Sequence, residues 1–162
     1  MFFSPVKSFM SIFEITPAML KKWDIQGIIL DIDNTMAPHN DPEPLKGIDE
    51  WIAGMKKNSI QLVIVSNNHA PRVEKMAARL GIDFIAEGAK PLPVGFSKAV
   101  KKMGLDRKNV CAIGDQIFTD IMGANIYGIR SFMVKPIAPE KSLPFRIKRM
   151  IEKPFLPKKY KN

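Results

Sequence analysis

Short apolar runs alternate with amphipathic segments along most of the chain. Each run is bounded by turn-forming or polar residues, which is typical of strands buried inside a sheet. The runs are GIIL (27–30), QLVIV (61–65), DFIA (83–86), NVCAIG (109–114) and SFMVK (131–135). The pattern therefore predicts five buried strands.

Amphipathic segments separate these runs. In three of them apolar residues fall at positions i, i+3, i+4 and i+7, so that they share one face of a helix. These residues are Ile48, Trp51, Ile52 and Met55; Val73, Met76, Ala77 and Leu80; and Phe96, Ala99, Val100 and Met103. A fourth segment, 117–127, has a less even pattern and is followed by Gly128. Strands and helices that alternate in this way predict an α/β fold, a doubly wound parallel sheet with helices on both faces.

The 162 residues are most simply one domain with two distinctive ends. Residues 1–134 carry 16 Lys and Arg against 14 Asp and Glu, a net charge of +2, whereas residues 135–162 carry 9 against 2, a net charge of +7. We expect an apolar lead-in at 1–26 that packs on the core or at a membrane interface, a central domain at 27–135, and a basic, proline-containing tail at 136–162. Such a tail either is solvated or meets a polyanion, which is nucleic acid or an anionic lipid surface.

The single cysteine, Cys111, excludes a disulfide framework and favours a reducing compartment. The N-terminal residues 1–20 are apolar and aromatic, but Pro5, Lys7 and Glu14 interrupt them, so neither a signal peptide nor a membrane span is predicted. We expect a cytoplasmic protein, or a peripheral one at the inner face of the membrane.

Polar and charged residues follow the predicted strands. They are Asp31 and Asp33 after the first strand, Ser66, Asn67 and Asn68 after the second, Glu87 and Lys90 after the third, and Asp115 and Asp120 after the fourth. In open parallel sheets, ligands bind beyond the carboxyl ends of the strands. We therefore expect these groups to meet at one edge of the sheet.

The residue types at this edge indicate phosphoryl chemistry. Three carboxylates repel each other unless a cation lies among them, and oxygen ligands without His or Cys favour Mg2+. A lysine and a serine hydroxyl opposite that cation would hold a dianionic oxyanion. One carboxylate can attack phosphorus to give an aspartyl-phosphate, which water then hydrolyses. A second carboxylate two residues on can protonate the leaving oxygen and then activate the water.

Four motifs, in order across residues 28–120, resemble those of the haloacid dehalogenase superfamily of aspartate-nucleophile phosphatases. DIDNT resembles the first motif. This resemblance implies that Asp31 is the nucleophile and a metal ligand. It also implies that Asp33 is the acid/base, with a backbone carbonyl that meets the metal, and that Thr35 is a supporting hydroxyl at the phosphate.

The other three motifs supply the remaining groups. VIVSNN resembles the second motif and implies that Ser66, nearby backbone amides and Asn67 bind the phosphoryl oxygens. For Asn67, helix entry, an Asx-turn or a place at the substrate rim are also open. EGAKP resembles the third motif, in which Lys90 neutralises charge on the nucleophile and the phosphoryl group. GDQIFTD resembles the fourth and implies Asp115 as a metal ligand and Asp120 as a second acidic residue that supports the metal site.

The spacing of the motifs leaves no room for an inserted cap domain. Only 34 residues lie between Asp31 and Ser66, and only 24 lie between Lys90 and Asp115. We therefore expect a core of the capless, subfamily III type. Its open edge would admit a phosphate that is carried on something large.

A closer resemblance covers residues 5–135. The lead-in SIFEITPAMLKKWDIQGIILDIDNT and the block GDQIFTDIMGANIYGI are similar to the family of phosphatidylglycerophosphate phosphatases and their bacterial homologues. This resemblance implies removal of the terminal phosphate from phosphatidylglycerophosphate, which yields phosphatidylglycerol. The expected partners are a lipid-borne phosphate monoester and an anionic membrane surface. The sequence leaves open whether the chain forms an oligomer.

Two other functions fit parts of the sequence. A soluble phosphatase of small phosphate esters would need the same catalytic residues. A nucleic-acid-binding protein with a degenerate phosphatase site would explain the basic tail but not the acidic residues together with Lys90. Taken singly, Asp31 and Asp33 could cap a turn, and Asp120 could lie at a helix N-terminus. His39 has no role in this chemistry and is expected at the surface of a loop.

Overall fold

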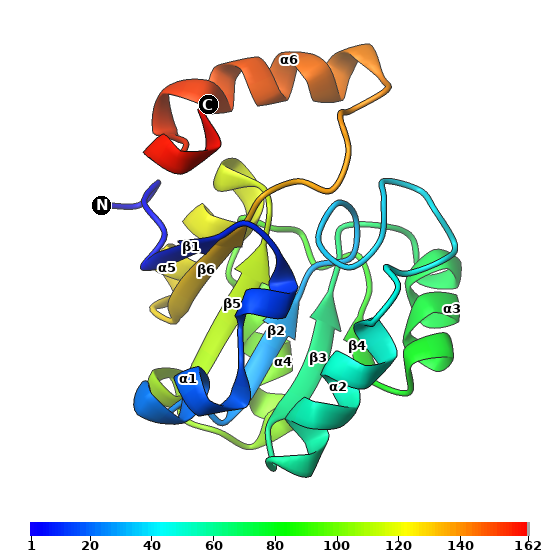
Figure 1. The fold of residues 1–162 in the computed structure, drawn as a ribbon, viewed down its shortest axis with the longest axis vertical. Helices are drawn as coiled ribbons and strands as arrows, with labels where there is room; N and C mark the ends of the chain where they lie inside the picture. The colour runs from blue at the N-terminus through cyan, green and yellow to red at the C-terminus, as the bar shows by residue number, and fades with distance from the viewer. Residues whose placement is uncertain (162) are drawn as a thin grey trace.

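The computed structural model describes residues 1–161 and arranges them as a six-stranded sheet between layers of helices (Figure 1). The strands are β1 (Lys7–Phe9), β2 (Gly27–Leu30), β3 (Gln61–Val65), β4 (Asp83–Ile85), β5 (Val110–Gly114) and β6 (Arg130–Val134). All pairs are parallel, and the order across the sheet is β1-β6-β5-β2-β3-β4. The chain winds from β2 to one side and then returns to the other, which confirms the predicted doubly wound α/β fold.

The sheet contains one strand that the apolar pattern does not predict. β1 is three residues long and pairs with β6 at the edge of the sheet. Only Phe9 of this strand is buried, so its sequence carries no run of buried residues. The N-terminal lead-in therefore contributes one edge strand to the sheet.

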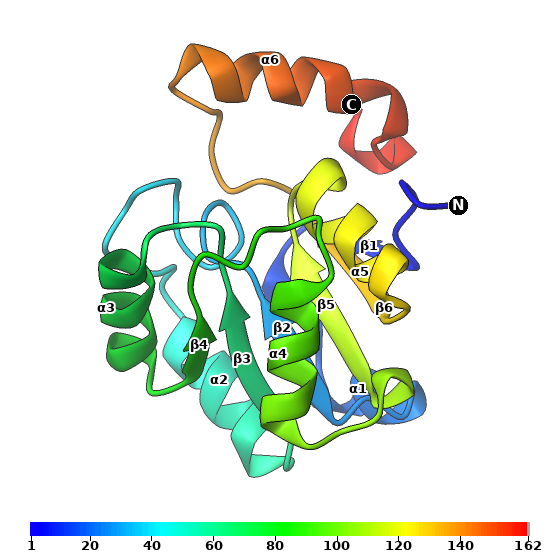
Figure 2. The same ribbon diagram turned by 180° about the vertical axis from the view of Figure 1, so that it is seen from behind.

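Helices cover both faces of the sheet. On one face lie α1 (Pro17–Lys22), α2 (Ile48–Lys57) and α3 (Ala70–Leu80), and on the other lie α4 (Val94–Met103) and α5 (Met122–Tyr127) (Figure 2). Successive residues of a strand point to opposite faces. Accordingly, Ile28 and Leu30 of β2 pack with the first group of helices, and Ile29 packs with the second.

The predicted helices are confirmed, with one local difference. α3 and α4 end at Gly81 and Gly104, which adopt the left-handed conformation with φ of 64° and 66°. The fourth predicted segment begins with a π-helical turn, Ile117–Ile121, and continues as α5. A π turn holds more residues than an α turn, which explains the uneven apolar spacing of this segment.

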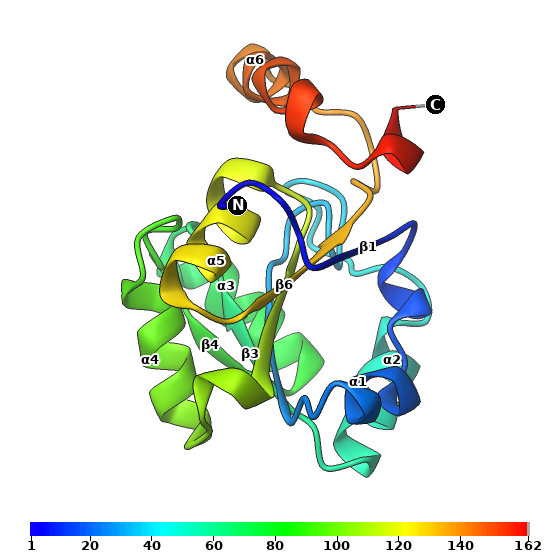
Figure 3. The ribbon, with the colours of Figure 1, turned by 90° about the vertical axis from the view of Figure 1, so that its left-hand side faces the viewer.

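The end of the chain folds back over the carboxyl ends of the strands. We call residues 136–161 the C-terminal arm; it contains α6 (Leu143–Glu152) and two short turns, Lys153–Phe155 and Lys158–Tyr160. α6 lies across the strand ends in Figures 1 and 3. The sequence pattern predicts a basic tail here and does not predict this helix.

The far end of the arm is attached to the edge of the sheet. The Tyr160 hydroxyl accepts a hydrogen bond from the Phe9 N–H at 3.0 Å and donates to the Phe9 carbonyl. The rings of Phe3 and Phe155 lie 4.9 Å apart, so the two ends of the chain are neighbours. Among residues 1–161, no helix combines the length and the apolar character needed to cross a bilayer.

Candidate active site

The loops that follow the strands meet at one side of the sheet, which we call the carboxyl edge. β2 lies between β3 and β5, so the residues that follow these three strands emerge side by side. Seven of the side chains expected from the motifs are buried there: Asp31, Asp33, Thr35, Ser66, Lys90, Asp115 and Asp120. The eighth, Asn67, is exposed.

Three aspartates form a buried acidic cluster. Asp31, Asp115 and Asp120 each offer a carboxylate oxygen, and these oxygens lie within 4.8 Å of one another. Burial, and then the charge of Asp120, raise the pKa of Asp31 well above its usual value. Burial also raises the pKa of Asp115, to about 7, although Arg149 opposes the shift. Hard oxygen ligands gathered in this way fit a divalent cation such as Mg2+.

Lys90 joins two members of the acidic cluster. Its ammonium group donates to Asp31 at 2.7 Å and to Asp120 at 2.6 Å. Burial alone would lower the pKa of Lys90, but the carboxylates of Asp120 and Asp31 outweigh it and raise the pKa. Lys90 therefore stays charged beside the Asp31 carboxylate, where it can also attract a phosphoryl group.

Asp33 is not a member of the acidic cluster, although it lines the same cavity as Asp31. Its carboxylate accepts hydrogen bonds from Arg72 at 2.5 Å, Asn68 at 2.5 Å and the Asn40 N–H at 2.9 Å. Burial would raise the pKa of Asp33, but these hydrogen bonds lower it. The motif pattern does not predict Arg72, which lies on α3, because its partner is 39 positions away in the sequence.

Gly114 and Thr35 shape the acidic cluster. A Cβ atom on Gly114, the last residue of β5, would lie 2.3 Å from the Asp120 Cγ. Only glycine therefore allows Asp120 to approach this closely. Thr35 Oγ1 lies 3.4 Å from Asp115 Oδ1 and donates to it.

Ser66 and Asn67 have different surroundings, although they are adjacent. Ser66 Oγ accepts a hydrogen bond from the Asn68 N–H at 3.1 Å and faces a cavity beside Asp31. Asn67 binds the backbone of Lys90 twice, because its Oδ1 accepts from the Lys90 N–H at 2.7 Å and its Nδ2 donates to the carbonyl at 2.9 Å. The sequence predicts that Asn67 contacts the phosphate. Its geometry instead favours a role in positioning the Lys90 loop.

The C-terminal arm supplies a cation that the motifs do not predict. Arg149 of α6 forms ion pairs with Asp115, with Glu140 at 3.0 Å and with Glu152 at 3.1 Å. The three carboxylate side chains are at most 4% exposed. Glu152 also accepts a hydrogen bond from the Phe118 N–H at 3.1 Å. The arm is therefore bound to the carboxyl edge through polar groups.

A cavity of about 180 Å³ lies between the sheet loops and α6. Asp31, Ser66 and Lys90 line it from the sheet, and Phe145 and Lys148 line it from α6. The core has no inserted cap, as expected. The expectation of an open edge is wrong in part, because Phe145 and Lys148 of the arm cover one side of the cavity.

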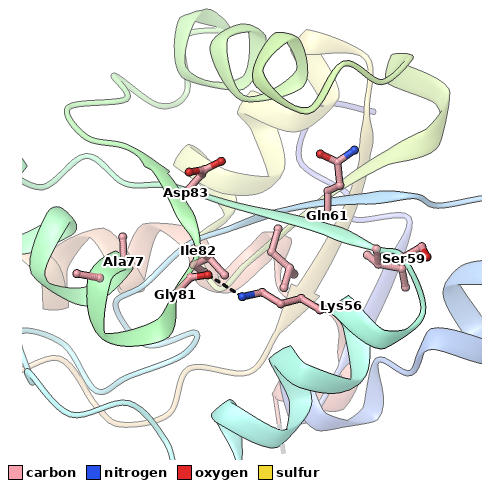
Figure 4. A pocket seen from close by; sticks show the side chains of 10 residues that line it. Lys56, Ser59, Gln61, Ala77, Gly81, Ile82 and Asp83 are labelled. Atoms are coloured by element: carbon pink, nitrogen blue, oxygen red, sulfur yellow. Dashed lines mark hydrogen bonds between the residues drawn. The ribbon is translucent and has the colours of Figure 1, made fainter.

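A larger hollow of about 670 Å³ lies at the opposite side of the sheet (Figure 4). Gln61 and Asp83, at the starts of β3 and β4, line it together with Lys56. The Lys56 ammonium donates to the Gly81 carbonyl at 2.6 Å and is exposed. The acidic cluster and Lys90 lie at the other ends of the strands, so the smaller cavity is the candidate active site.

Comparisons with known proteins agree with a hydrolase of phosphate esters. Residues 39–128 match the haloacid dehalogenase-like hydrolases. The chain is 37% identical over 155 residues to "Probable phosphatase YqeG" of Bacillus subtilis (strain 168), a match that covers 96% of this chain and 90% of that protein. It is 27% identical over 111 residues to the 3-deoxy-D-manno-octulosonate 8-phosphate phosphatase KdsC of Salmonella typhi, which covers 63% of this chain and 59% of that protein.

Solved structures share the fold. A protein from Listeria monocytogenes serotype 4b superposes with a TM-score of 0.57 at 18% identity, over 80% of this chain and 99% of that one. CbbY from Rhodobacter sphaeroides, solved in complex with phosphate, superposes with a TM-score of 0.56 at 17% identity, over 69% of this chain and 86% of that one. At these identities the likeness concerns the fold alone.

The structure is a doubly wound parallel sheet whose candidate active site, with three buried aspartates, lies at the carboxyl edge. The chain belongs to the haloacid dehalogenase-like hydrolase family. Within that family it is a phosphatase.

Proposed function

We propose that this phosphatase hydrolyses phosphate monoesters through an aspartyl-phosphate on Asp31, with Mg2+ as its metal ion. The observation that carries the proposal is the contact of Lys90 with Asp31 inside the cavity that Ser66 also lines. The proposed nucleophile, the Lys90 cation and the proposed phosphate-binding hydroxyl of Ser66 therefore line one small cavity.

The acidic cluster provides the metal site in this proposal. The carboxylates of Asp31, Asp115 and Asp120 and the backbone carbonyl of Asp33 would hold Mg2+. When bound, the ion neutralises negative charge on the phosphoryl group and on the aspartates that surround it.

The side chains then divide the reaction into two steps. A carboxylate oxygen of Asp31 attacks phosphorus, and the bond from phosphorus to the ester oxygen breaks while Asp33 gives that oxygen a proton. Water next attacks the aspartyl-phosphate, Asp33 takes its proton, and phosphate and the free Asp31 carboxylate are released. Lys90 and Ser66 hold the phosphoryl oxygens throughout. Arg72 and Asn68 stabilise the Asp33 carboxylate, so Asp33 must give up these hydrogen bonds and be protonated before it can donate to the leaving oxygen.

We further propose that the substrate is phosphatidylglycerophosphate. The sequence resemblance of the lead-in and of the fourth motif supports this substrate, and so does the outer surface of α6. Leu143, Ile147, Met150 and Ile151 fall at one side of this helix and are between 48% and 65% exposed. The inner side carries the polar groups of Lys148 and Arg149, so α6 presents its apolar side to the surroundings.

The charge of the arm complements an anionic lipid bilayer. The arm contains eight Lys and Arg but only two Glu, and both Glu side chains are bound to Arg149. An exposed apolar stripe beside unpaired cations is typical of a helix that lies in the interface of an anionic membrane. A lipid headgroup could then enter the cavity below α6.

Vesicle flotation tests the membrane surface. We expect the protein to bind vesicles of phosphatidylglycerol and phosphatidylcholine, and Ile151→Glu to weaken binding about ten-fold or more, because burial of isoleucine contributes about 1.5–3 kcal/mol. Val94→Glu is the matched control, since Val94 is 51% exposed and lies on α4 rather than on the arm. Equal binding of both variants would contradict the proposed surface.

A soluble phosphatase of small phosphate esters is the second candidate. The similarity to KdsC, whose name gives a sugar acid phosphate as its substrate, favours it. Phosphate release from phosphatidylglycerophosphate in mixed micelles should be compared with release from a panel of soluble esters. A higher kcat/KM for the lipid supports our proposal, and a higher kcat/KM for a soluble ester replaces it with the second candidate.

A further inference from the structure

We propose that Lys148 forms a second anion subsite, which selects phosphate monoesters that carry another phosphate a few atoms from the scissile one. The inference rests on the proposed phosphatase function and names the substrate class of the same site. Lys148 lies outside the four motifs, in the C-terminal arm.

Lys148 shares a cavity with the proposed nucleophile. Asp31, Ser66 and Lys90 belong to its sheet side, whereas Lys148 and Phe145 belong to its α6 side. The volume of the cavity is about 180 Å³, well below the range of about 300–1,000 Å³ that holds a drug-sized ligand. When the phosphate of a substrate is bound at Asp31, the substrate atoms next to that phosphate therefore lie beside α6.

Lys148 differs from the other lysine of this cavity in its partners. Lys90 is paired with Asp31 and Asp120. The Lys148 ammonium donates to the Gln116 side-chain carbonyl, and within residues 1–161 no carboxylate forms an ion pair with it. An ammonium group has three donors, so Lys148 can bind an anion while it keeps the Gln116 contact. The cavity thus contains one cation whose charge is not neutralised.

The position of Lys148 is fixed from two sides. The next residue, Arg149, binds the buried Asp115 carboxylate and so holds this turn of α6 at the carboxyl edge. Gln116, whose side-chain oxygen accepts the hydrogen bond from Lys148, also donates its backbone N–H to Asp120 at 3.1 Å. The second cation is therefore attached to the same acidic cluster that positions the reaction.

Two rings form the wall beside Lys148. His39 and Phe145 pack edge to face, with ring centroids 4.6 Å apart, and both line the cavity. The sequence predicts that His39 lies at the surface of a loop, and this prediction is wrong. The His39 side chain is only 22% exposed, and its Nδ1 lies 3.3 Å from Glu140. Rings at this place suit a short uncharged spacer, such as the carbons of glycerol, between two phosphates.

Two sources have this chemistry. One is a lipid headgroup, in which a phosphodiester lies three glycerol carbons from the terminal phosphate. The other is a free bisphosphate of a small polyol. Both place a monoester at Asp31 and a second anion near Lys148.

Calorimetry with an inactive variant tests the subsite without turnover. In an Asp31→Asn background with Mg2+ present, we expect glycerol 1,3-bisphosphate to bind about ten-fold or more tightly than glycerol 3-phosphate, the factor for one charge-assisted hydrogen bond. Adding Lys148→Met should abolish this preference and leave the affinity for glycerol 3-phosphate unchanged. Lys148→Arg should keep the preference, and so should Lys153→Met, which removes the same charge from an exposed residue at the end of α6.

Each outcome decides the proposal. Equal affinities for the two esters, or a preference that persists in Lys148→Met, would overturn the subsite. Short-chain phosphatidylglycerophosphate, used as a soluble monomer, separates the two sources. If the free bisphosphate shows the Lys148-dependent preference and this lipid does not, the subsite is correct and the lipid substrate of the proposed function fails.

Discussion

Replacing Arg149 with methionine should release the C-terminal arm from the carboxyl edge. Methionine keeps most of the length of the side chain but removes the guanidinium group that binds Asp115, Glu140 and Glu152. Three carboxylates, all nearly inaccessible to solvent, would then face each other without a cation.

The free energy lost in Arg149→Met follows from the burial of these three carboxylates. Removing one partner of a buried ion pair costs about 3–5 kcal/mol, because a buried charge is left uncompensated. The Arg149 side chain is 19% exposed, so we take the lower end, about 3 kcal/mol. α6 buries only Glu152 fully, so local opening of the arm relieves the repulsion more easily than unfolding of the sheet. About 3 kcal/mol corresponds to a roughly 100-fold larger open fraction.

Limited proteolysis with thermolysin measures this opening. Cleavage near the start of the arm, followed by mass spectrometry, should be about 100-fold faster in Arg149→Met when opening and reclosing are fast relative to cleavage. Arg146→Met is the matched control, because Arg146 is exposed on the same helix. If both variants are cleaved at the rate of the unmodified protein, Arg149 does not hold the arm.

Two further predictions concern packing and pH. Gly114→Ala should displace Asp120, lower the free energy of unfolding by about 1–3 kcal/mol and reduce phosphate release. The control is Gly54→Ala, whose added Cβ meets no atom within 4 Å and which should stabilise α2 by up to about 1 kcal/mol. Urea unfolding that gives both variants the same change in stability would contradict this prediction. Burial raises the pKa of Tyr160 to about 12 in the folded protein, above the value of about 10 in the unfolded chain. The contribution of Tyr160 to the free energy of unfolding is therefore fully present below pH ~10 and is lost as the pH rises through ~12. The loss of stability in Tyr160→Phe, about 1 kcal/mol at pH 9, should shrink by pH 12, and a constant difference would refute the shift.

The sheet and its helices are readable from the sequence because each buried strand is a continuous apolar run. β1 is not readable, since it is a short edge strand with one buried residue, Phe9. The sequence pattern also does not predict α6, but for a different reason. Four of its apolar residues, Leu143, Ile147, Met150 and Ile151, are exposed. Its basic residues resemble those of a solvated tail, and only the structure shows that Arg149 binds Asp115, 34 positions earlier.

The candidate site is predicted in part for a related reason. Parallel strands bring their following residues to one edge, so motif positions alone place Asp31 and Lys90 together although 59 positions separate them. The partners of Asp33 could not be predicted, because Arg72 reaches it from the side of α3. Nothing local in the sequence connects Lys148 with the cavity. The sequence thus predicts groups that follow strands and misses groups that approach from other elements.

Phosphate release by Asp31→Asn tests the central claim most directly. The substitution keeps the shape of the side chain but removes the nucleophile, so we expect no Mg2+-dependent release above background, in a protein with an unchanged circular dichroism spectrum. Asp106→Asn is the matched control, since Asp106 is an exposed carboxylate just before β5, at the far side of the sheet, and it should retain full activity. Turnover by folded Asp31→Asn at the rate of the unmodified enzyme would contradict the account.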